Sequence, residues 1–473
     1  MPQHYACLHD RLNSAGRPYN HPSCIGREWP VTSWNLRNAV VVNEGRTFEA
    51  DVLIAGGRIE RLGGTTTDPN ATDIDLGGAW LLPGMIDDQV HFREPGFEHK
   101  GNIATESRAA VAGGTTSYLE MPNCVPQTVT PEALLDKHTR AAPRSIANYG
   151  FYFGATNDNL EAIKRVDITK ACGVKVFMGA STGNMLVDDP DTLEGIFASC
   201  PLVIATHCED TPTILANEAR ARAEFGDAVP IEQHPAIRSA EACYKSSSLA
   251  VSLARRHGSR LHVLHLTTAR EMDLFEPGPI DGKRITAEAC VHHLFFNDSW
   301  YGPLGNDLKC NPSVKTRADQ LALRHAVVED RIDVIATDHA PHTREEKDAP
   351  YVDAPAGLPL VQHALLTLVE HVKAGEMTIE QVVQKTAHAP ATLFEIAGRG
   401  YIREGYFADL AVVDPGAHTV VDDEPVHAKC GWTPFRGFTF RSRITHTFVN
   451  GNLAYADGQL RDVPMGVALE FSR

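Results

Sequence analysis

The feature that most constrains the fold of this sequence is the alternation of apolar, strand-like runs with helical patterns through the middle of the chain. Such alternation is typical of βα units built around a parallel sheet. About eight such runs are present, which is the number that a (β/α)8 barrel needs. We therefore predict the α/β class, with a TIM-type barrel over residues 81–400 and strands at Leu81–Asp87, Thr115–Met121, Ala147–Phe153, Gly173–Phe177, Leu202–His207, Arg260–His265, Ile285–Ala289 and Val334–Thr337.

Short β segments flank the predicted barrel on both sides. Residues 34–80 hold several segments broken by glycine-containing turns, and residues 401–460 hold several more, with Asn450-Gly451 as a strong hairpin signal. We predict that these two stretches build one composite β-sandwich from both chain ends. Residues 1–33 are expected to be a loosely ordered N-terminal extension, and residues 461–473 a C-terminal tail.

The composition of the chain argues against several classes of binding partner. The chain has 44 Lys and Arg against 60 Asp and Glu, a net charge of −16, whereas nucleic acid or an anionic membrane requires a basic surface. No apolar run approaches the roughly 18 residues of a membrane span, and the first thirty residues lack the apolar stretch of a signal peptide. The ten cysteines show no metal-finger spacing, which favours reduced thiols. We expect a cytoplasmic protein that acts on a small molecule.

Reactive side chains gather at the carboxyl ends of the predicted strands, which meet at one mouth in a barrel. Lys175 lies inside an apolar strand, where an unpaired ammonium group is expensive to bury. Either a carboxylate pairs with it, which is the simpler expectation, or carbon dioxide converts its amine to a carbamate able to bridge two metal ions. The other strand-end residues are His91, Asn123, His207, His265 and Asp338.

The first predicted strand runs into an unusually polar cluster. If the backbone stays extended, Asp88 points away from the face that carries Asp87, Gln89, His91 and Arg93. An imidazole is a metal ligand, and a guanidinium two residues further on offers a fork for a substrate carboxylate.

Two further strand-end residues complete the predicted site. The carboxylate of Asp338 can bind a cation and take a proton from water. By the same alternation, His262 faces away from His265, so we expect His262 to be a hydrogen-bonded core or interface histidine, and we expect the same of His292 and His293.

Several short motifs occur along the chain, in the same order as the predicted barrel strands. They are His91-Phe92-Arg93-Glu94-Pro95-Gly96, Glu120-Met121-Pro122-Asn123, Lys175-Val176-Phe177-Met178, Thr206-His207-Cys208-Glu209, Lys309-Cys310-Asn311-Pro312, Asp338-His339-Ala340-Pro341-His342 and Gly357-Leu358-Pro359. As a set they resemble the amidohydrolase superfamily of metal-dependent (β/α)8 hydrolases, and within its cyclic amidohydrolase branch the dihydroorotases, over nearly all of residues 36–460.

This resemblance implies a function and a set of roles. It implies reversible interconversion of dihydroorotate and N-carbamoyl-aspartate in pyrimidine synthesis, with one or two Zn²⁺ ions per chain and a possible homodimer. A carboxylated Lys175 would bridge the ions, one held also by His91 and Asp338, the other by His207 and His265. Asp338 would be the catalytic acid and base. The implied substrate contacts are Arg93, Asn123 and His342 for the carboxylate, with Asn311, Ala356 and Gly357 for the ring.

The sequence departs from the family pattern at one metal position. The first strand of this family usually reads His-X-His, and Gln89 stands at the first position here. An amide oxygen is a poorer zinc ligand than imidazole. Gln89 could still coordinate through its oxygen, it could form hydrogen bonds while His91 holds the metal, or a single zinc could bind.

Two rival functions follow. Because allantoinases and hydantoinases generally do not pair residues of the Arg93 and Asn123 type, we expect a dihydroorotase rather than one of these cyclic amidohydrolases. Only Gln89 favours a metal-poor, dihydroorotase-like scaffold, and because the other ligand positions remain, we expect a working enzyme.

Overall fold

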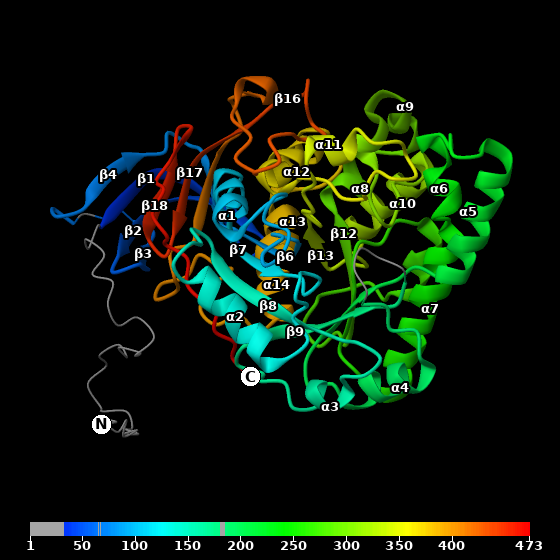
Figure 1. Ribbon diagram of the computed structural model, residues 1–473. Helices are drawn as coiled ribbons and strands as arrows, with labels where there is room; N and C mark the ends of the chain where they lie inside the picture. Colours follow the sequence, from blue (N-terminus) through cyan, green and yellow to red (C-terminus); the bar gives the residue numbers. More distant parts are fainter. Residues whose placement is uncertain (1–32, 65, 67, 180–184) are drawn as a thin grey trace.

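A computed structural model describes residues 33–64, 66, 68–179 and 185–473, so the predicted extension over residues 1–33 lies outside the described residues apart from Ser33. Its central unit is a ring of eight parallel strands surrounded by helices (Figure 1). The predicted (β/α)8 barrel is therefore confirmed. The barrel strands are β6 (Met85–Val90), β7 (Thr115–Glu120), β8 (Asn148–Gly154), β9 (Ala171–Phe177), β10 (Ile204–His207), β11 (Leu261–Val263), β12 (Ile285–Cys290) and β13 (Val334–Ala336).

The barrel closes between its first and last strands just beyond their ends. Val90 forms a parallel bridge with His339, and the His91 backbone N–H donates to the His339 carbonyl at 2.7 Å. The helices that surround the barrel are α1 (Ile103–Ala112), α2 (Pro131–Ala141), α3 (Leu160–Ile163), α4 (Pro190–Ser199), α5 (Thr211–Phe225), α6 (His234–Ile237), α7 (Ala240–His257), α8 (Val291–Phe295), α9 (Tyr301–Leu304), α10 (Arg317–Val328), α11 (Arg344–Lys347), α12 (Ala364–Lys373), α13 (Ile379–Val383) and α14 (Ala389–Leu393).

The first predicted strand, Leu81–Asp87, is in fact two strands in different sheets. Its start belongs to β5 (Trp80–Pro83) of the flanking sheet, and its end belongs to β6 of the barrel. Gly84 joins them at a point where a Cβ would lie 2.2 Å from the side chain of Thr116. Glycine is needed here because the chain passes too close to β7 for any side chain.

Both ends of the described chain contribute to one nine-stranded sheet beside the barrel, as predicted (Figure 1). The main path is β19-β18-β17-β14-β5-β1-β2-β3, and β4 pairs with β1. Its buried apolar side chains, including Trp34, Val52 and Phe448, form a second core separate from that of the barrel. The remaining strands are β1 (Trp34–Asn43), β2 (Arg46–Ala55), β3 (Arg58–Leu62), β4 (Thr72–Asp75), β14 (Leu410–Asp414), β17 (Arg443–Val449), β18 (Asn452–Ala456) and β19 (Gln459–Leu460), together with a separate pair, β15 (Thr419–Val420) and β16 (Thr439–Phe440).

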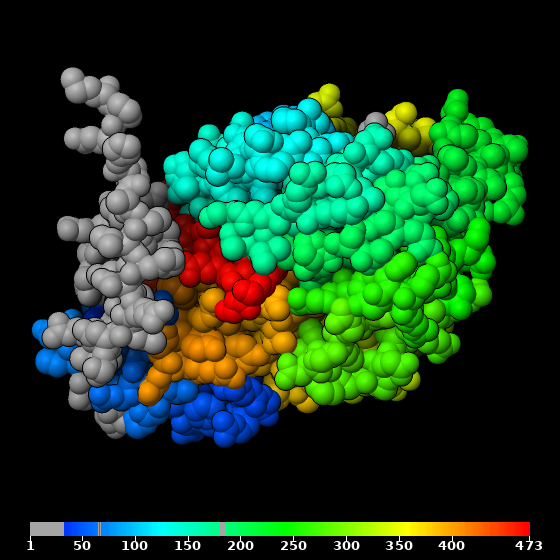
Figure 2. All heavy atoms as spheres, turned by 90° about the horizontal axis from the view of Figure 1, so that it is seen from below, coloured from blue at the N-terminus to red at the C-terminus, as the bar shows by residue number. Residues whose placement is uncertain are grey.

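The C-terminal residues run along the amino ends of two barrel strands. Tyr149 of β8 donates its backbone N–H to Val467 and accepts from Leu469. The Arg473 guanidinium donates to the carbonyls of Ala171 and Cys172 in β9. Figure 2 shows these residues in red, lodged between the earlier and later parts of the barrel. The tail therefore covers the end of the barrel opposite the predicted mouth.

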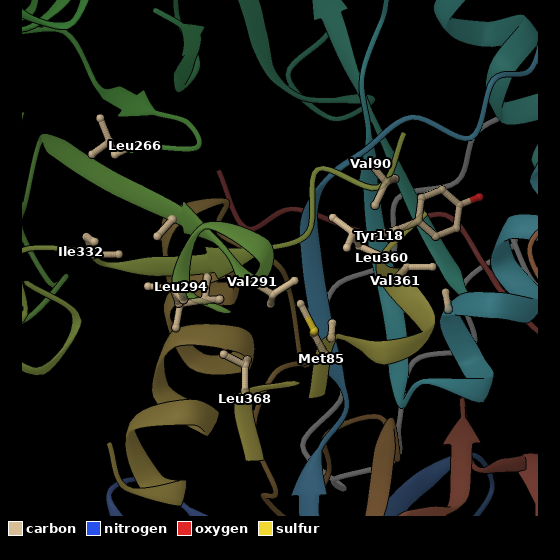
Figure 3. Close-up of a cluster of buried hydrophobic side chains, with 14 of the residues drawn as sticks. Met85, Val90, Tyr118, Leu266, Val291, Leu294, Ile332, Leu360, Val361 and Leu368 are labelled. Carbon is tan, nitrogen blue, oxygen red and sulfur yellow. The ribbon is translucent and has the colours of Figure 1, made fainter. Parts of the chain in front are cut away.

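Apolar side chains fill the space between the strands and the surrounding helices. Figure 3 shows Met85, Val90 and Tyr118 from β6 and β7 close to Leu360 and Val361, with Leu368 of α12 nearby. These residues are almost fully buried. No helix in the described part of the chain is long and apolar enough to cross a membrane.

Candidate active site

A pocket of about 420 Å³, including its open mouth, lies at the carboxyl ends of the barrel strands. It gathers all of the predicted site residues except His342, which lies directly behind Arg93. Phe177 and Ala340, which stand in the motifs noted above but had no predicted role, complete the wall. The pocket is lined by Gln89, His91, Arg93, Asn123, Lys175, Phe177, His207, His265, Asn311, Asp338, Ala340, Ala356 and Gly357.

Three of these residues have a backbone conformation that L-amino acids rarely adopt. The φ angles are 69° at Arg93, 40° at His265 and 51° at Asp338. Residues with positive φ are uncommon outside glycine and concentrate at functional sites, where the surrounding structure holds them. His265 and Asp338 lie just past the observed ends of β11 and β13, which are shorter than predicted.

His91, Asp338 and Gln89 form the first group in the pocket. His91 donates from Nδ1 to Asn123 Oδ1 at 2.8 Å, so a neutral His91 presents the lone pair of Nε2 to Asp338 Oδ1, 3.1 Å away. Burial lowers the pKa of His91, which favours this neutral form. Burial raises the pKa of Asp338, but a proton shared with His91, together with the charges of His292 and Lys175, outweighs burial and holds that pKa below its usual value. Gln89 Nε2 donates to Asp338 Oδ1 at 3.1 Å.

His207 and His265 form the second group. His207 Nδ1 lies 3.0 Å from His265 Nε2. Burial lowers the pKa of both imidazoles, that of His265 strongly. His265 Nδ1 is buried without a hydrogen-bond partner in the described structure, and His207 Nε2 lies 3.1 Å from Glu209 Oε2.

Lys175 reaches the pocket from the middle of the wholly buried strand β9. Its side chain is 1% exposed, and Nζ lies 4.7 Å from the centre of the Phe177 ring. Burial lowers its pKa to about 8. Across the described ranges, no carboxylate lies within ion-pair distance of Nζ, so the ion pair that was the simpler expectation is not present.

The two groups have a donor set that fits a metal ion. Two acceptors facing each other at 3.1 Å, as in His91 and Asp338, are stabilised only by a proton or a cation between them. Two ligands of one tetrahedral zinc, at bond lengths of 2.0–2.2 Å, lie about 3.3 Å apart. The separations of 3.1 Å and 3.0 Å in the two groups are close to that value. The residues present are therefore compatible with metal binding, and the hydrogen bond from His91 to Asn123 is the kind that orients a ligating imidazole.

Arg93 contributes a buried positive charge to the pocket. The residue is 6% exposed; its Nε donates to the Pro341 carbonyl at 3.0 Å, and one terminal nitrogen lies 3.0 Å from His342 Nε2. No carboxylate in the described structure pairs with it. Burial lowers its pKa to about 10.

The loop that carries Ala356 and Gly357 is held by a buried lysine that no sequence motif pointed to. Lys347 Nζ donates to the carbonyls of Lys309, Pro355 and Gly357 at 3.1–3.2 Å. Gly357 has a φ of 145°, and a Cβ there would lie 2.4 Å from the Ala340 carbonyl oxygen. The backbone can therefore approach the pocket only with glycine at this position.

The expectation that Asp88 lies on the opposite face of the strand from Gln89 is wrong, although Asp88 does not line the pocket. A register shift between Asp87 and Val90 breaks the alternation of β6. The Asp88 carboxylate lies 3.2 Å from His262 Nε2, and that atom lies 3.5 Å from Glu288. Because β6 and β11 are not neighbouring strands, this contact crosses the barrel interior. His262 is indeed a buried histidine, hydrogen-bonded to Thr286 at 2.8 Å, as expected.

A second buried ion pair supports the strand end that carries His91 and Arg93. Glu120 Oε2 lies 2.6 Å from Lys137 Nζ, and Glu120 Oε1 accepts the Phe92 backbone N–H at 3.2 Å. Glu120 stands in one of the motifs noted above, whereas nothing in the sequence pointed to Lys137 on α2. Their pairing depends on the packing of a helix against the barrel.

A (β/α)8 barrel with imidazoles, a carboxylate and a buried lysine at its mouth defines a barrel hydrolase. The model of the amidohydrolase family matches residues 80–454. The chain therefore belongs to the amidohydrolase family, and it is a hydrolase of the cyclic amidohydrolase branch, as the motifs predicted.

Similar proteins carry several names. The chain is 35% identical over 406 residues to a dihydroorotase of Halobacterium salinarum, covering 85% of this chain and 92% of that one. It is 31% identical over 430 residues to an allantoinase of Bacillus velezensis, covering 89% of this chain and 94% of that one. The solved L-hydantoinase of Arthrobacter aurescens superposes with a TM-score of 0.87 at 25% identity, covering 93% of this chain and all of that one.

Proposed function

We propose that this protein is a zinc-dependent dihydroorotase, which interconverts dihydroorotate and N-carbamoyl-aspartate in pyrimidine synthesis. The observation that carries the proposal is the guanidinium of Arg93, buried in the pocket wall without a carboxylate partner in the described structure. An unpaired buried charge is strongly unfavourable, so this position favours a substrate that brings an anion. Dihydroorotate carries a ring carboxylate, whereas allantoin and hydantoin rings are uncharged and leave Arg93 unpaired.

The other pocket residues suit the same substrate. Asn123 accepts from His91 through Oδ1 and lines the pocket together with Arg93, where an amide can contact a substrate carboxylate. Asn311 Oδ1 is buried without a partner in the described chain and can accept a ring N–H. The backbone at Ala356 and Gly357 supplies further polar groups at the pocket wall.

The two groups of side chains described above are the proposed metal-binding positions. We assign His91 and Asp338 as the residues that would hold one Zn²⁺ and His207 and His265 as those that would hold the other, and a carboxylated Lys175 would be a ligand of both. Carboxylation forms a bond between Lys175 Nζ and the carbon of CO₂ and releases one proton to water. The absence of an ion-pair partner for Lys175 among the described residues supports this assignment. When bound, zinc polarises an amide carbonyl and raises the acidity of water.

Gln89 and Asp338 have separate roles in this scheme. As placed, Gln89 holds Asp338 through a hydrogen bond, which favours the alternative in which Gln89 orients a ligand and does not coordinate. Asp338 accepts a proton from water during ring opening and returns it to the ring nitrogen. The remaining ligand positions favour catalysis over a metal-poor scaffold.

The test is hydrolysis and formation of dihydroorotate by the zinc-supplied native protein and by Arg93→Met, with Arg270→Met as a matched control. Arg270 is exposed and pairs with Glu241 on the surface. Removing one partner of a buried charge pair costs about 2–5 kcal/mol, so kcat/KM should fall by roughly 30-fold to several thousand-fold in Arg93→Met alone. Undiminished turnover in Arg93→Met, or none in the native protein in either direction, contradicts the proposal.

A further inference from the structure

A cluster of three ligand-type side chains lies beside the pocket and outside the metal positions assigned above. Cys290 ends barrel strand β12, and His292 and His293 follow in α8. One potential ligand atom from each residue lies within 4.8 Å of the other two. All three are buried, with exposures of 0%, 0% and 3%.

The hydrogen bonding of the two histidines leaves nitrogen atoms without partners. His293 Nε2 lies 3.1 Å from the Pro312 carbonyl oxygen and donates to it, so Nδ1 of the neutral ring carries a free lone pair. That Nδ1 atom and both ring nitrogens of His292 have no hydrogen-bond partner in the described structure, so the expectation that His292 is hydrogen-bonded is wrong. Leaving buried polar atoms unsatisfied is unfavourable, so these nitrogens call for a ligand, which can bind one nitrogen of each ring.

The chemistry of the cluster selects the kind of ligand. We infer that Cys290, His292 and His293 form a further metal site, which takes a borderline-soft divalent cation such as Zn²⁺. Thiolate and neutral imidazole are the common protein ligands of zinc, and a histidine whose second nitrogen donates to a backbone carbonyl has the usual arrangement of a ligating imidazole. Binding forms a metal–sulfur bond and releases the thiol proton of Cys290 to solvent.

The site adjoins the position where the sequence departs from the family pattern. The Cys290 sulfur lies 3.9 Å from Gln89 Oε1 and 3.5 Å from Glu288 Oε1. Glu288 Oε1 in turn accepts the His265 backbone N–H at 2.9 Å. Gln89 and Glu288 thus connect the cluster to Asp338 and His265, one residue of each assigned metal position. The inference does not depend on the identity of the substrate.

The second buried group of this type differs in its hydrogen bonding and charge. In Asp88, His262 and Glu288, the imidazole stands between two carboxylates, and these hold a proton on it. That group already holds its positive charge in an ion pair within the protein. In the described structure, no carboxylate forms an ion pair with either imidazole of the cysteine cluster. We therefore base the inference on the cysteine cluster.

The experiment uses the full-length protein, stripped of metal and reconstituted with Co²⁺ as the probe. A cobalt–thiolate bond gives a charge-transfer absorption that nitrogen and oxygen ligands do not give. We expect this band in the native protein and its loss in Cys290→Ser. Cys208→Ser is the matched control, because Cys208 is equally buried and lies next to the assigned ligand His207. The control should keep the band.

Zinc content separates this inference from the proposed function. His293→Gln should lose one equivalent of bound zinc relative to the native protein, and it serves as a second variant should Cys290→Ser fail to fold. Lys175→Ala removes the assigned bridging ligand and should keep the cobalt–thiolate band. A native protein without the band, a band that survives Cys290→Ser, or one that disappears in Cys208→Ser overturns the inference, whatever the outcome for dihydroorotate.

Discussion

The buried ion pair between Glu120 and Lys137 gives a sharp prediction about stability. Both side chains are 1% exposed, and their charged atoms lie 2.6 Å apart. Burial raises the pKa of Glu120, which shows how strongly its charge depends on a partner. Lys137→Met would leave the carboxylate buried against apolar neighbours. Such a loss costs about 3–5 kcal/mol, a large part of the 5–15 kcal/mol that stabilises a typical protein.

Urea unfolding measures this effect. Lys164→Met is the matched control, because its pair with Glu161 is exposed at 39% and 68% and should contribute less than about 1 kcal/mol. The double variant Glu120→Gln with Lys137→Met should recover part of the loss, since no charge is then stranded. A loss in Lys137→Met no larger than that in the control, or a double variant less stable than Lys137→Met, would refute the reasoning.

Three further predictions concern the pocket and the barrel interior. Gln89→His should raise metal affinity by roughly tenfold or more, because imidazole is a better zinc ligand than an amide oxygen. The measurement is the zinc that the protein retains after dialysis against a chelator. If Gln89→His retains no more zinc than the native protein, no assigned metal lies next to this residue. Lys347→Met removes the hydrogen bonds that hold Gly357 and should raise KM for dihydroorotate more than it lowers kcat; an effect on kcat alone argues against a positioning role. Burial alone lowers the pKa of His262, but Asp88 and Glu288 outweigh it and raise that pKa to about 9. The resulting contribution to the free energy of unfolding is fully present below pH about 6.5 and decreases by up to about 3 kcal/mol as pH rises through about 9. Urea unfolding of the native protein should show this decrease, and urea unfolding of His262→Gln should not.

The barrel could be predicted because its signals are local. Each buried strand is an apolar run, and its last residues carry the polar side chains that reach the mouth. The division of Leu81–Asp87 between two sheets was not visible, because it depends on how closely Gly84 approaches Thr116 on a strand that comes later in the sequence. The hairpin signal at Asn450-Gly451 was reliable, since the turn residues themselves fix the pairing of β17 with β18.

The pocket residues could be predicted because they lie at strand ends. The residues that support the pocket from outside could not be predicted. His207 ends one apolar strand and His265 follows the next, so barrel geometry alone brings them together. Asp88 was misplaced because alternation assumes a regular strand, and β6 contains a register shift. Lys137 and Lys347 lie on helices and contact the site only through tertiary packing, for which a single sequence holds no local signal.

The most direct test of the proposed function is a comparison of two substrates. It measures kcat/KM of the zinc-supplied native protein for dihydroorotate and for allantoin under identical conditions. Because Arg93 is matched by a carboxylate only in dihydroorotate, a charged hydrogen bond worth about 2–3 kcal/mol or more should favour dihydroorotate by at least roughly 30-fold. Equal or faster hydrolysis of allantoin would contradict the assignment of Arg93 and the proposed function with it.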